Sequence, residues 1–258
     1  MTFGPSAATL TLLEKLAVDN GFDRELPREG AWLAFASTQS PLRIWLSAPG
    51  EALFLAALSQ SNVAVALDTG TTATSSLPSG AVAARAVTSL SALHRLVRRA
   101  FQLSKTLPHE LLYTFEKQTA TLPRSTEAER VVVQRVGQSI FRAGLLEYWE
   151  GRCAVTGLAV PGLLRASHIK PWADCASDAE RLDVFNGLLL APHLDAAFDC
   201  GFITVADDST VVVSDRLGEA ARHILGLANP QSVTALAPGH RAYLPWHRER
   251  VFRKNDSR

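Results

Sequence analysis

The chain is 258 residues long, 47% of its residues are hydrophobic, and its formal net charge at pH 7 is only +1. This length and apolar content are enough for one large or two modest hydrophobic cores, and we predict two domains. A near-neutral chain has no global attraction for a polyanion, so any binding to nucleic acid has to come from local basic patches.

Two features of the sequence indicate a cytoplasmic protein without a membrane partner. No uninterrupted apolar run approaches the roughly 20 residues of a membrane-spanning helix. The N-terminal sequence MTFGPSAATL lacks the charged-then-apolar pattern of a signal peptide. The cysteines Cys153, Cys175 and Cys200 form no CxxC pair, which argues against a zinc knuckle, and their odd number argues against a disulfide framework. We expect Cys153 to be a small buried residue beside a turn.

The first part of the chain alternates between helical and extended patterns. We predict a helix over 8–20, a charged loop around Pro27, a strand over 42–48 and a short helix over 51–60. The small polar stretch TGTTATSSLPSG, residues 69–80, is typical of a flexible loop. Four aromatic residues suit either a core, which is the commoner role, or a pocket for a flipped base; they are Trp32, Phe35, Trp45 and Phe54.

The middle of the chain is helical in pattern. Thr126 and Glu129 form the spacing of a capping box, which predicts a long helix that ends near Trp149. Two shorter helices are expected before it, at about 91–105 and 108–120. The predicted domain boundary lies near Leu122, giving an N-terminal domain of residues 1–122 and a C-terminal domain of residues 123–258.

The C-terminal half contains a compact strand–strand–helix pattern. Residues 163–169 read as a strand that Pro171 ends, which places His168 at a strand end. Asn186-Gly187 is a turn dipeptide before an apolar run and suits a tight connection or the start of a second strand. Pro192 fits the first turn of a helix that Gly201 stops, and residues 202–205 read as another strand. The predicted helix carries His193, Asp195 and Asp199.

These residue types together suit the hydrolysis of a phosphodiester. A neutral imidazole such as that of His168 can deprotonate water near physiological pH. A divalent cation needs oxygen or imidazole ligands, for which Asp195 and His193 are the nearest candidates. The amide of Asn186 is suited either to orient the histidine or to add a neutral oxygen ligand.

The region from 141 to 205 resembles the HNH endonucleases, and specifically their restriction-endonuclease-like branch. The resemblance rests on the ordered pieces FRAGLLEYWEGRCAVTG, RASHIKPW, NGLLLAPHLDAAFDCGFI and the closing YLPWHRERVF. It implies a ββα-metal fold in which His168 is the general base and Asn186 the middle asparagine. The third letter falls on Asp195, an aspartate in place of a histidine, which the resemblance implies is a metal ligand.

The resemblance leaves the complete ligand set open. Ser167 stands where many members of the family carry a metal-binding aspartate or histidine. Three residues are possible substitutes, with the first ranked highest: His193, Asp183 and Asp199. Mg²⁺ is the expected ion, and Mn²⁺, Ni²⁺ and Zn²⁺ remain alternatives.

Local basic patches are candidates for contact with DNA, the expected partner. One follows the helix expected over 91–105, a second leads into and through the histidine motif, and a third is the tail HRERVFRKNDSR. Phosphate contacts by such residues supply most of the nonspecific affinity for DNA. The candidates in the first two patches are Arg95, Arg98 and Arg99, and then Arg142, Arg165 and Lys170.

We therefore predict an α+β protein in which a mixed α/β N-terminal domain and a long linking helix precede a C-terminal ββα-metal nuclease domain. Its expected function is metal-dependent DNA cleavage, of a restriction or modification-dependent kind, with the N-terminal domain as a recognition module. The alternative is a non-catalytic DNA-binding or regulatory protein that keeps the scaffold, motivated by Ser167 and Asp195. A homodimer is also left open.

Overall fold

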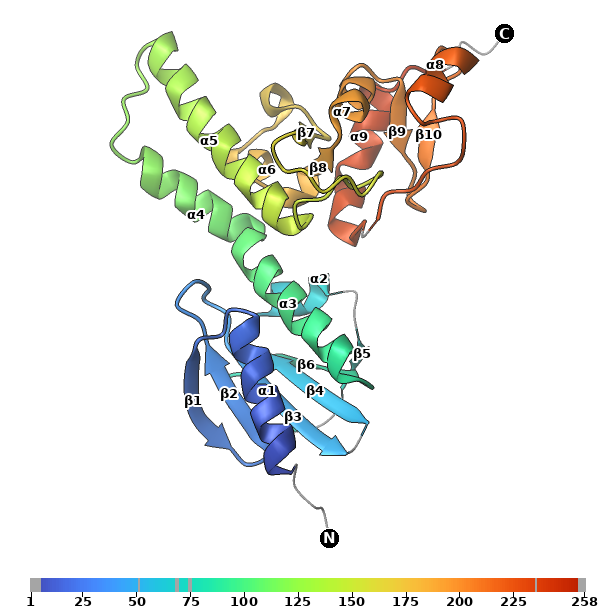
Figure 1. Cartoon of the computed structure of the whole chain (residues 1–258). Coiled ribbons are helices and arrows are strands. Elements are labelled where there is room, and N and C mark those ends of the chain that lie inside the picture. Colours follow the sequence, from blue (N-terminus) through green and yellow to red (C-terminus); the bar gives the residue numbers. More distant parts are fainter. Residues whose placement is uncertain (1–5, 51, 68–69, 74–75, 235, 255–258) are drawn as a thin grey trace. The chain divides into compact units, whose positions relative to one another are not determined.

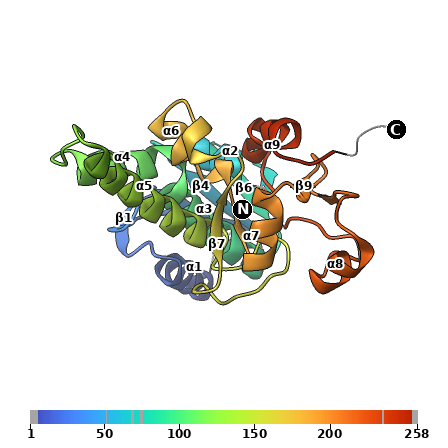
Figure 2. The same ribbon diagram turned by 90° about the horizontal axis from the view of Figure 1, so that it is seen from above.

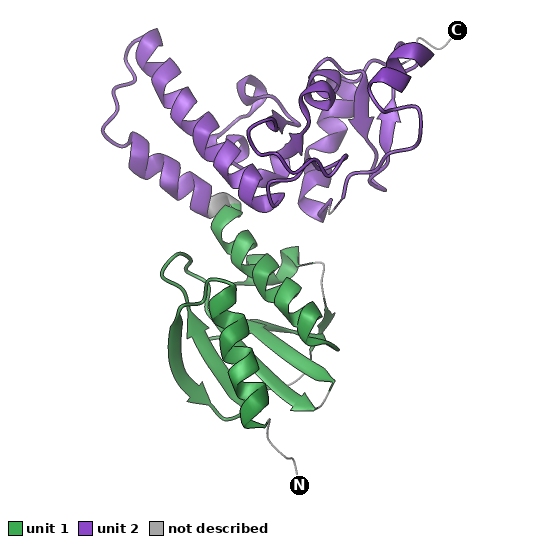
Figure 3. Cartoon of the chain, viewed as in Figure 1, with its two compact units in different colours: residues 1–107 green, residues 108–258 purple. Residues whose placement is uncertain are grey.

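The structure is a computed structural model that describes residues 6–50, 52–67, 70–73, 76–234 and 236–254. The chain divides into two compact units, residues 1–107 and 108–258 (Figure 3). The division precedes the boundary expected at Leu122, because α4 (Pro108–Thr119) packs against α5 (Glu127–Tyr148) in the second unit. Within the described residues, no helix combines the length and hydropathy of a membrane span.

Unit 1 is an antiparallel sheet with helices on one face. The strands lie in the order β1-β2-β3-β4-β6-β5, and α1 and α3 cross the same face (Figure 1). Phe22, just after α1, meets Phe101 of α3 edge to face with ring centroids 5.6 Å apart. The elements are α1 (Ala7–Asp19), β1 (Arg24–Glu29), β2 (Trp32–Ala36), β3 (Ile44–Gly50), β4 (Leu53–Leu58), α2 (Ser61–Ala66), β5 (Thr71–Thr72), β6 (Ala83–Val87) and α3 (Leu90–Thr106).

The helix predicted over 51–60 is wrong, because β4 occupies most of that segment. Its run LFLAAL pairs antiparallel with β3 on one side and with β6 on the other. A short apolar run does not distinguish a central strand from a buried helix, and here sheet pairing decides the outcome. The charged segment around Pro27 is also a strand, β1, paired with β2. In the loop predicted over 69–80, Thr71–Thr72 form the short strand β5, while residues 69, 74 and 75 lie outside the described residues.

The four aromatic residues weighed as a base pocket do not share one face of the sheet. Trp45 pairs with Ala34, whereas Phe35 pairs with Ile44, so Trp45 and Phe35 project to opposite faces. Both are core residues, each 2% exposed. The register therefore distributes these rings over two layers and does not line a single pocket with them.

Unit 2 begins with the α4–α5 hairpin. The capping box at Thr126 and Glu129 is confirmed: each side chain accepts from the other residue's backbone N–H at the start of α5. Helix α5 turns Phe141, Leu145 and Tyr148 toward the interior.

The rest of unit 2 is built around a small antiparallel pair. Strand β7 pairs with β8, so that His168 stands opposite Gly187, and α7 follows β8 directly. Figure 2 shows β7 between α5 and α7. The elements are β7 (Arg165–His168), α6 (Asp178–Arg181), β8 (Gly187–Leu190), α7 (Pro192–Asp199), β9 (Ile203–Val205), β10 (Val211–Val213), α8 (Glu219–Ile224) and α9 (Leu244–Arg250), with short 3-10 turns at Trp172–Asp174, Val184–Asn186 and Pro238–Ala242.

Close packing explains the Asn-Gly dipeptide at the start of β8. A Cβ on Gly187 would lie 2.5 Å from the Phe141 ring and 2.8 Å from Leu145, both on α5. Its φ of −151° is ordinary extended backbone, so the glycine is needed for proximity and not for a turn. The absent side chain lets α5 lie directly against the strand that carries the partner of His168.

Candidate active site

His168 is held at the end of β7 by aromatic packing and one hydrogen bond. Its ring stacks on Phe141, with centroids 3.8 Å apart, and meets Trp172 edge to face at 5.8 Å. Its Nε2 lies 2.9 Å from the carbonyl oxygen of Arg181. Because a carbonyl oxygen only accepts, Nε2–H is the donor, and the neutral ring presents Nδ1 as its acceptor nitrogen.

The electrostatic surroundings of His168 favour this neutral form. Burial lowers the pKa of His168 below its usual value, and the hydrogen bond to Arg181 only partly opposes that shift. The imidazole is therefore ready to accept a proton at neutral pH, which is the state that a general base requires.

Asn186 is fully buried and holds the loop that contacts His168. Its Oδ1 accepts from the backbone N–H of Lys170 at 2.8 Å, and its Nδ2 lies 3.1 Å from the carbonyl oxygens of Lys170 and Glu180. The same Nδ2 also lies 3.3 Å from the sulfur of Cys175. Glu180 directly precedes Arg181, so the amide fixes the carbonyl group that orients the histidine. The side chain reaches His168 only through the loop.

Replacing Asn186 by alanine is expected to destabilise unit 2 by about 2–4 kcal/mol, because buried partners such as the Lys170 N–H would lose their hydrogen bonds. Urea denaturation of the full chain measures the effect. Asn229→Ala, which changes an exposed asparagine of the same unit, is the matched control and should unfold like the wild type. Equal stability of the two variants would contradict the structural role given to Asn186.

A cluster of oxygen atoms lies around Ser167, the residue before His168 on β7. The hydroxyl of Ser167, which is 2% exposed, donates to Oδ1 of Asp199 at 3.1 Å. Asp195 stands one turn earlier on α7, at the i, i+4 spacing that places two side chains on one helix face. Helical spacing therefore places the side chains of Asp195 and Asp199 on the same face of α7.

Both aspartates are harder to ionise than a free carboxyl group, and the charge of Asp199 adds to the cost for Asp195. Burial raises the pKa of Asp195, the charge of Asp199 raises it further, and Ser167 and Arg165 lower it. Partial desolvation also raises the pKa of Asp199, against the effect of its Ser167 hydrogen bond. Like charges in a partly desolvated site favour either a shared proton or a bound cation.

His193 does not join this cluster. It lies two residues before Asp195, which is about 200° around an α-helix, so the two side chains leave α7 in nearly opposite directions. His193 lines a separate cavity of about 400 Å³ together with Thr156, Leu227 and Gln231. His193 and Asp195 thus lie on different faces of α7, whereas Asp199 lies on the same face as Asp195. Asp183, the other alternative, accepts a hydrogen bond from Tyr243 at 2.8 Å.

The predicted DNA-binding residues differ in their exposure and in whether they already bond to other groups of the protein. Arg142 donates to the carbonyl oxygens of Leu164 and Pro161 at 2.6 and 2.9 Å, so it stabilises the loop before β7. Lys170 pairs with Glu180 at 2.9 Å, whereas Arg165 is exposed. In unit 1, Arg95 and Arg98 of α3 are exposed and Arg99 is half-buried.

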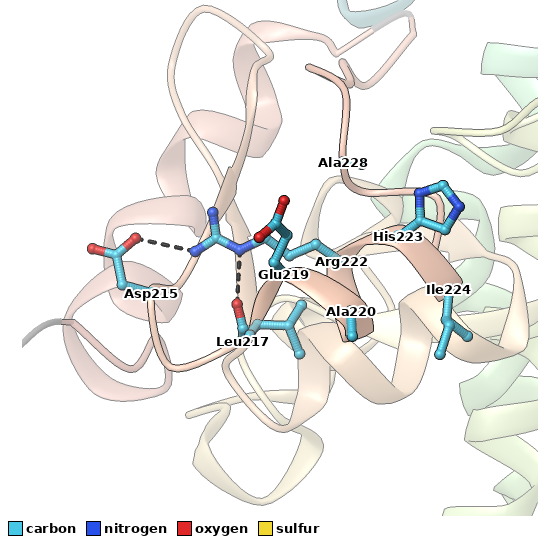
Figure 4. A pocket seen from close by; sticks show the side chains of 9 residues that line it. Asp215, Leu217, Glu219, Ala220, Arg222, His223, Ile224 and Ala228 are labelled. Carbon is cyan, nitrogen blue, oxygen red and sulfur yellow. Dashed lines mark hydrogen bonds and ion pairs between the residues drawn. The ribbon is translucent and has the colours of Figure 1, made fainter.

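Two cavities in unit 2 contrast in their chemistry. One of about 320 Å³ is lined by Ser167, His168, Trp172 and Asp199 together with Val251, and so brings the histidine and an aspartate to a shared space. Another of about 980 Å³ lies at α8 and is lined by none of the predicted site residues (Figure 4). There Arg222 is already paired with Asp215 at 3.1 Å and with the Leu217 carbonyl oxygen at 2.7 Å.

The oxygen cluster contains fewer candidate metal ligands than a three-letter motif suggests. In the described part of the chain, no group of three or more His, Cys, Asp or Glu side chains is arranged to hold a metal ion. The oxygen cluster has two such residues and a serine hydroxyl, all of them hard oxygen donors of the kind that Mg²⁺ prefers. The residues present therefore fit a hard divalent cation that keeps several water ligands.

Cys153 has the role expected of a small buried residue. Its sulfur accepts from the backbone N–H groups of Thr156 at 3.4 Å and Ala191 at 3.3 Å. These contacts close the turn before the loop that leads to β7 and tie it to the start of α7.

Comparison with known proteins agrees with the arrangement of β7, β8 and α7. Residues 153–206 match the family model described as HNH endonuclease, and this range contains His168, Asn186, Asp195 and Asp199. No curated protein matches the chain. Residues 153–206 are therefore an HNH endonuclease domain.

Proposed function

We propose that unit 2 is a divalent-cation-dependent DNA endonuclease whose reaction takes place in the cavity shared by His168, Ser167 and Asp199. The observation that carries the proposal is the hydrogen bond from His168 to the Arg181 carbonyl oxygen, which leaves Nδ1 as the acceptor of a neutral, half-buried imidazole in that cavity. A neutral histidine beside acidic oxygen ligands is the pair of functions that phosphodiester hydrolysis requires.

His168 is the proposed general base. Its Nδ1 takes a proton from a water molecule as that water attacks the scissile phosphorus, and the resulting imidazolium is stabilised by the Arg181 carbonyl oxygen that accepts from Nε2. The ring cannot turn away without breaking this bond and its stack on Phe141. The orientation of the base is thus set before substrate binds, which favours catalysis.

Asp195 and Asp199 are the proposed ligands of the cation, and Ser167 holds Asp199 in place and is available as a neutral oxygen ligand. When bound, a divalent ion would offset negative charge on the phosphate and on the leaving oxygen. Mg²⁺ suits these donors best, and Mn²⁺ shares the preference for oxygen ligands.

Unit 1 is proposed to contribute contacts with DNA through α3. Arg95 and Arg98 are exposed and lie at i, i+3 spacing, where like charges destabilise an isolated helix. Phosphate groups of DNA would compensate that repulsion and use both guanidinium groups. A role of the whole chain in a restriction system would follow if unit 1 selects the DNA target.

The function is tested by incubating the full chain with supercoiled plasmid in Mg²⁺, in Mn²⁺ and in EDTA. We expect nicked and linear DNA with either cation and none in EDTA. Plain, methylated and hydroxymethylated plasmids are compared, because a recognition module can demand a modified base. Intact plasmid under every one of these conditions, despite tight binding of DNA, would instead favour a non-catalytic DNA-binding protein.

A further inference from the structure

The C-terminal arm, residues 244–254, lies outside the matched range 153–206 and yet borders the candidate active site. It consists of α9 and the four residues after it. Val251 of the arm lines the same cavity of about 320 Å³ as His168 and Asp199, and so does His247. A strand of DNA whose scissile phosphate enters this cavity would pass close to the arm.

His247 fixes the inner side of the arm to α7. Its ring stacks on Phe198 with centroids 3.7 Å apart, and its Nε2 lies 3.1 Å from the Phe198 carbonyl oxygen. Since that carbonyl only accepts, Nε2–H donates, and Nδ1 accepts from the Thr204 hydroxyl at 2.9 Å. Burial lowers the pKa of His247 to about 4, so the ring stays neutral and keeps both bonds at physiological pH.

The end of the arm is attached to the loop after α7. The backbone N–H of Arg253 donates to the Gly201 carbonyl oxygen at 2.9 Å, and the Ser214 hydroxyl donates to the Arg253 carbonyl oxygen at 2.6 Å. A Cβ on Gly201 would lie 2.0 Å from the Val251 carbonyl oxygen, so only glycine permits this approach. The arm is therefore in a defined position relative to Asp199, two residues before Gly201.

The outer side of the arm carries positive charge that the described structure leaves uncompensated. Arg250, Arg253 and Lys254 are exposed, and none forms an ion pair with a residue in the described part of the chain. Two other arginines of the unit are paired, Arg248 with Asp207 at 3.0 Å and Arg222 with Asp215 at 3.1 Å. The three cations are thus available to an anionic partner.

Arg253 is also partly ordered in advance. Its guanidinium lies over the Phe202 ring at 4.5 Å from the centroid. Stacking on an aromatic face limits the side chain to fewer rotamers while its N–H groups stay open to solvent. A planar fork of donors held in this way suits the oxygen atoms of a phosphate group.

We propose that the outer side of the C-terminal arm binds the DNA backbone next to the scissile phosphate, with Arg250, Arg253 and Lys254 each contacting a phosphate. This inference rests on the proposed nuclease function. It assigns to the arm two tasks that different side chains perform. His247 holds the arm to the helix of the acidic residues, and the three cations hold the substrate strand.

The test is binding of a fluorescein-labelled 30-base-pair duplex, measured by anisotropy in EDTA so that no cleavage occurs. For Arg250→Gln/Arg253→Gln/Lys254→Gln we expect roughly 10- to 100-fold weaker binding and a slope of log affinity against log salt that is smaller by about 2–3, because each lost phosphate contact removes about 0.9. The double variant Arg250→Gln/Lys254→Gln keeps the Arg253–Phe202 contact. Its slope should fall by about two thirds of the decrease expected for the triple variant.

The matched control removes the same number of charges elsewhere in the unit. Lys117→Gln/Arg130→Gln/Arg135→Gln changes exposed residues of α4 and α5 that do not line the cavity. It should bind the duplex within about threefold of the wild type, since net charge alone acts weakly at physiological salt. In Mn²⁺, with the rate measured over a range of DNA concentrations, the arm variant should show an unchanged kcat and a raised KM.

Each outcome decides between the two proposals. Unchanged affinity of the arm variant, or an equal loss in the control, would overturn the arm as a DNA-binding surface and leave the nuclease function standing. If the arm variant binds DNA more weakly but the wild type never cleaves, the arm is supported as a DNA-binding surface and the nuclease function is overturned. A wild type that neither binds nor cleaves the duplex would overturn both.

Discussion

Replacing His168 by alanine is expected to lower the rate of plasmid cleavage by about 10²–10⁴-fold, the usual contribution of a general base. The ring nitrogen Nδ1 is the group lost, and no other imidazole of the described residues is fixed at this cavity with an acceptor nitrogen open to it: His247 also lines it, but both of its ring nitrogens are already bonded. Single-turnover cleavage in saturating Mn²⁺ measures the chemical step without the contribution of product release.

Two companion variants separate catalysis from folding. His168→Phe keeps an aromatic ring on Phe141 and removes both nitrogens, so it should be as inactive as the alanine variant while retaining the stack seen in the structure. His193→Ala removes a histidine that lines a different cavity and should cleave like the wild type. Activity in His168→Phe, or loss of activity in His193→Ala, would show that His168 is not the general base.

The pH profile of the same reaction carries a second signature of His168. Because burial lowers the pKa of this histidine, the neutral form persists below pH 6.5, and the acidic limb of the cleavage rate should fall below that value. The limb should disappear in the residual activity of the alanine variant. A limb above pH 6.5 would indicate that a different group limits the rate.

Local sequence rules are sufficient for much of unit 2. The capping box at Thr126, the proline at the start of α7 and the glycine after it each act within one helical turn, and the structure has all three features where these residues stand. The alternation of a short strand, a glycine and an acidic helix likewise depends on neighbours in the chain. Such signals do not need knowledge of the tertiary fold.

Tertiary packing explains what the sequence alone misses. The run Leu53–Leu58 becomes a strand because β3 and β6 lie on either side of it, a fact that no property of LFLAAL contains. Asn186 and Gly187 read as a turn, yet one is a buried hydrogen-bonding centre and the other a gap for Phe141. Gly187 depends on α5, and Asn186 depends on the loop that contains Lys170 and Glu180, so neither role follows from the dipeptide itself.

The acidic pair shows how far a motif can determine ligands. Letter matching selects Asp195 and then its near neighbour His193, whereas helical geometry selects Asp199, one turn from Asp195. Ser167 belongs to the same group because it precedes the base on a strand whose successive side chains alternate in direction. The cavity lined by Ser167, His168 and Asp199 brings the base and one of the acids to a shared space, and helical periodicity explains the pairing of the two acids better than residue identity does.

Replacing both aspartates, as Asp195→Asn/Asp199→Asn, is expected to abolish cleavage and to weaken binding of Mn²⁺ by at least about 1,000-fold. A unit charge 4 Å away at an effective dielectric constant of 20 contributes about 4 kcal/mol, and each 1.4 kcal/mol is tenfold in affinity. The asparagines keep the shape and the hydrogen bond with Ser167, so the charge is the quantity removed. Isothermal titration of the full chain with Mn²⁺ measures the affinity independently of activity.

The same substitution should stabilise the protein in EDTA, and this result distinguishes a cation site from an ordinary pair of surface acids. Both carboxyl groups have a pKa raised by the fold, so their contribution to stability is present below the unfolded pKa and is lost as pH rises through the folded one. At pH 7 the metal-free pair therefore costs stability, and uncharged asparagines remove that cost.

The full expectation is a higher Tm than the wild type in EDTA and a smaller rise in Tm when Mn²⁺ is added. Asp207→Asn/Asp208→Asn, which changes acids after β9, is the control and should leave the response to Mn²⁺ unchanged. A double variant that is less stable than the wild type in EDTA would show that the pair stabilises the fold. A double variant whose Tm rises with Mn²⁺ as much as that of the wild type would show that the pair does not bind the cation. A carboxylate with a structural role stabilises the protein in the absence of a cation. Two carboxylates that bind a cation repel each other and lower the stability until the cation is bound.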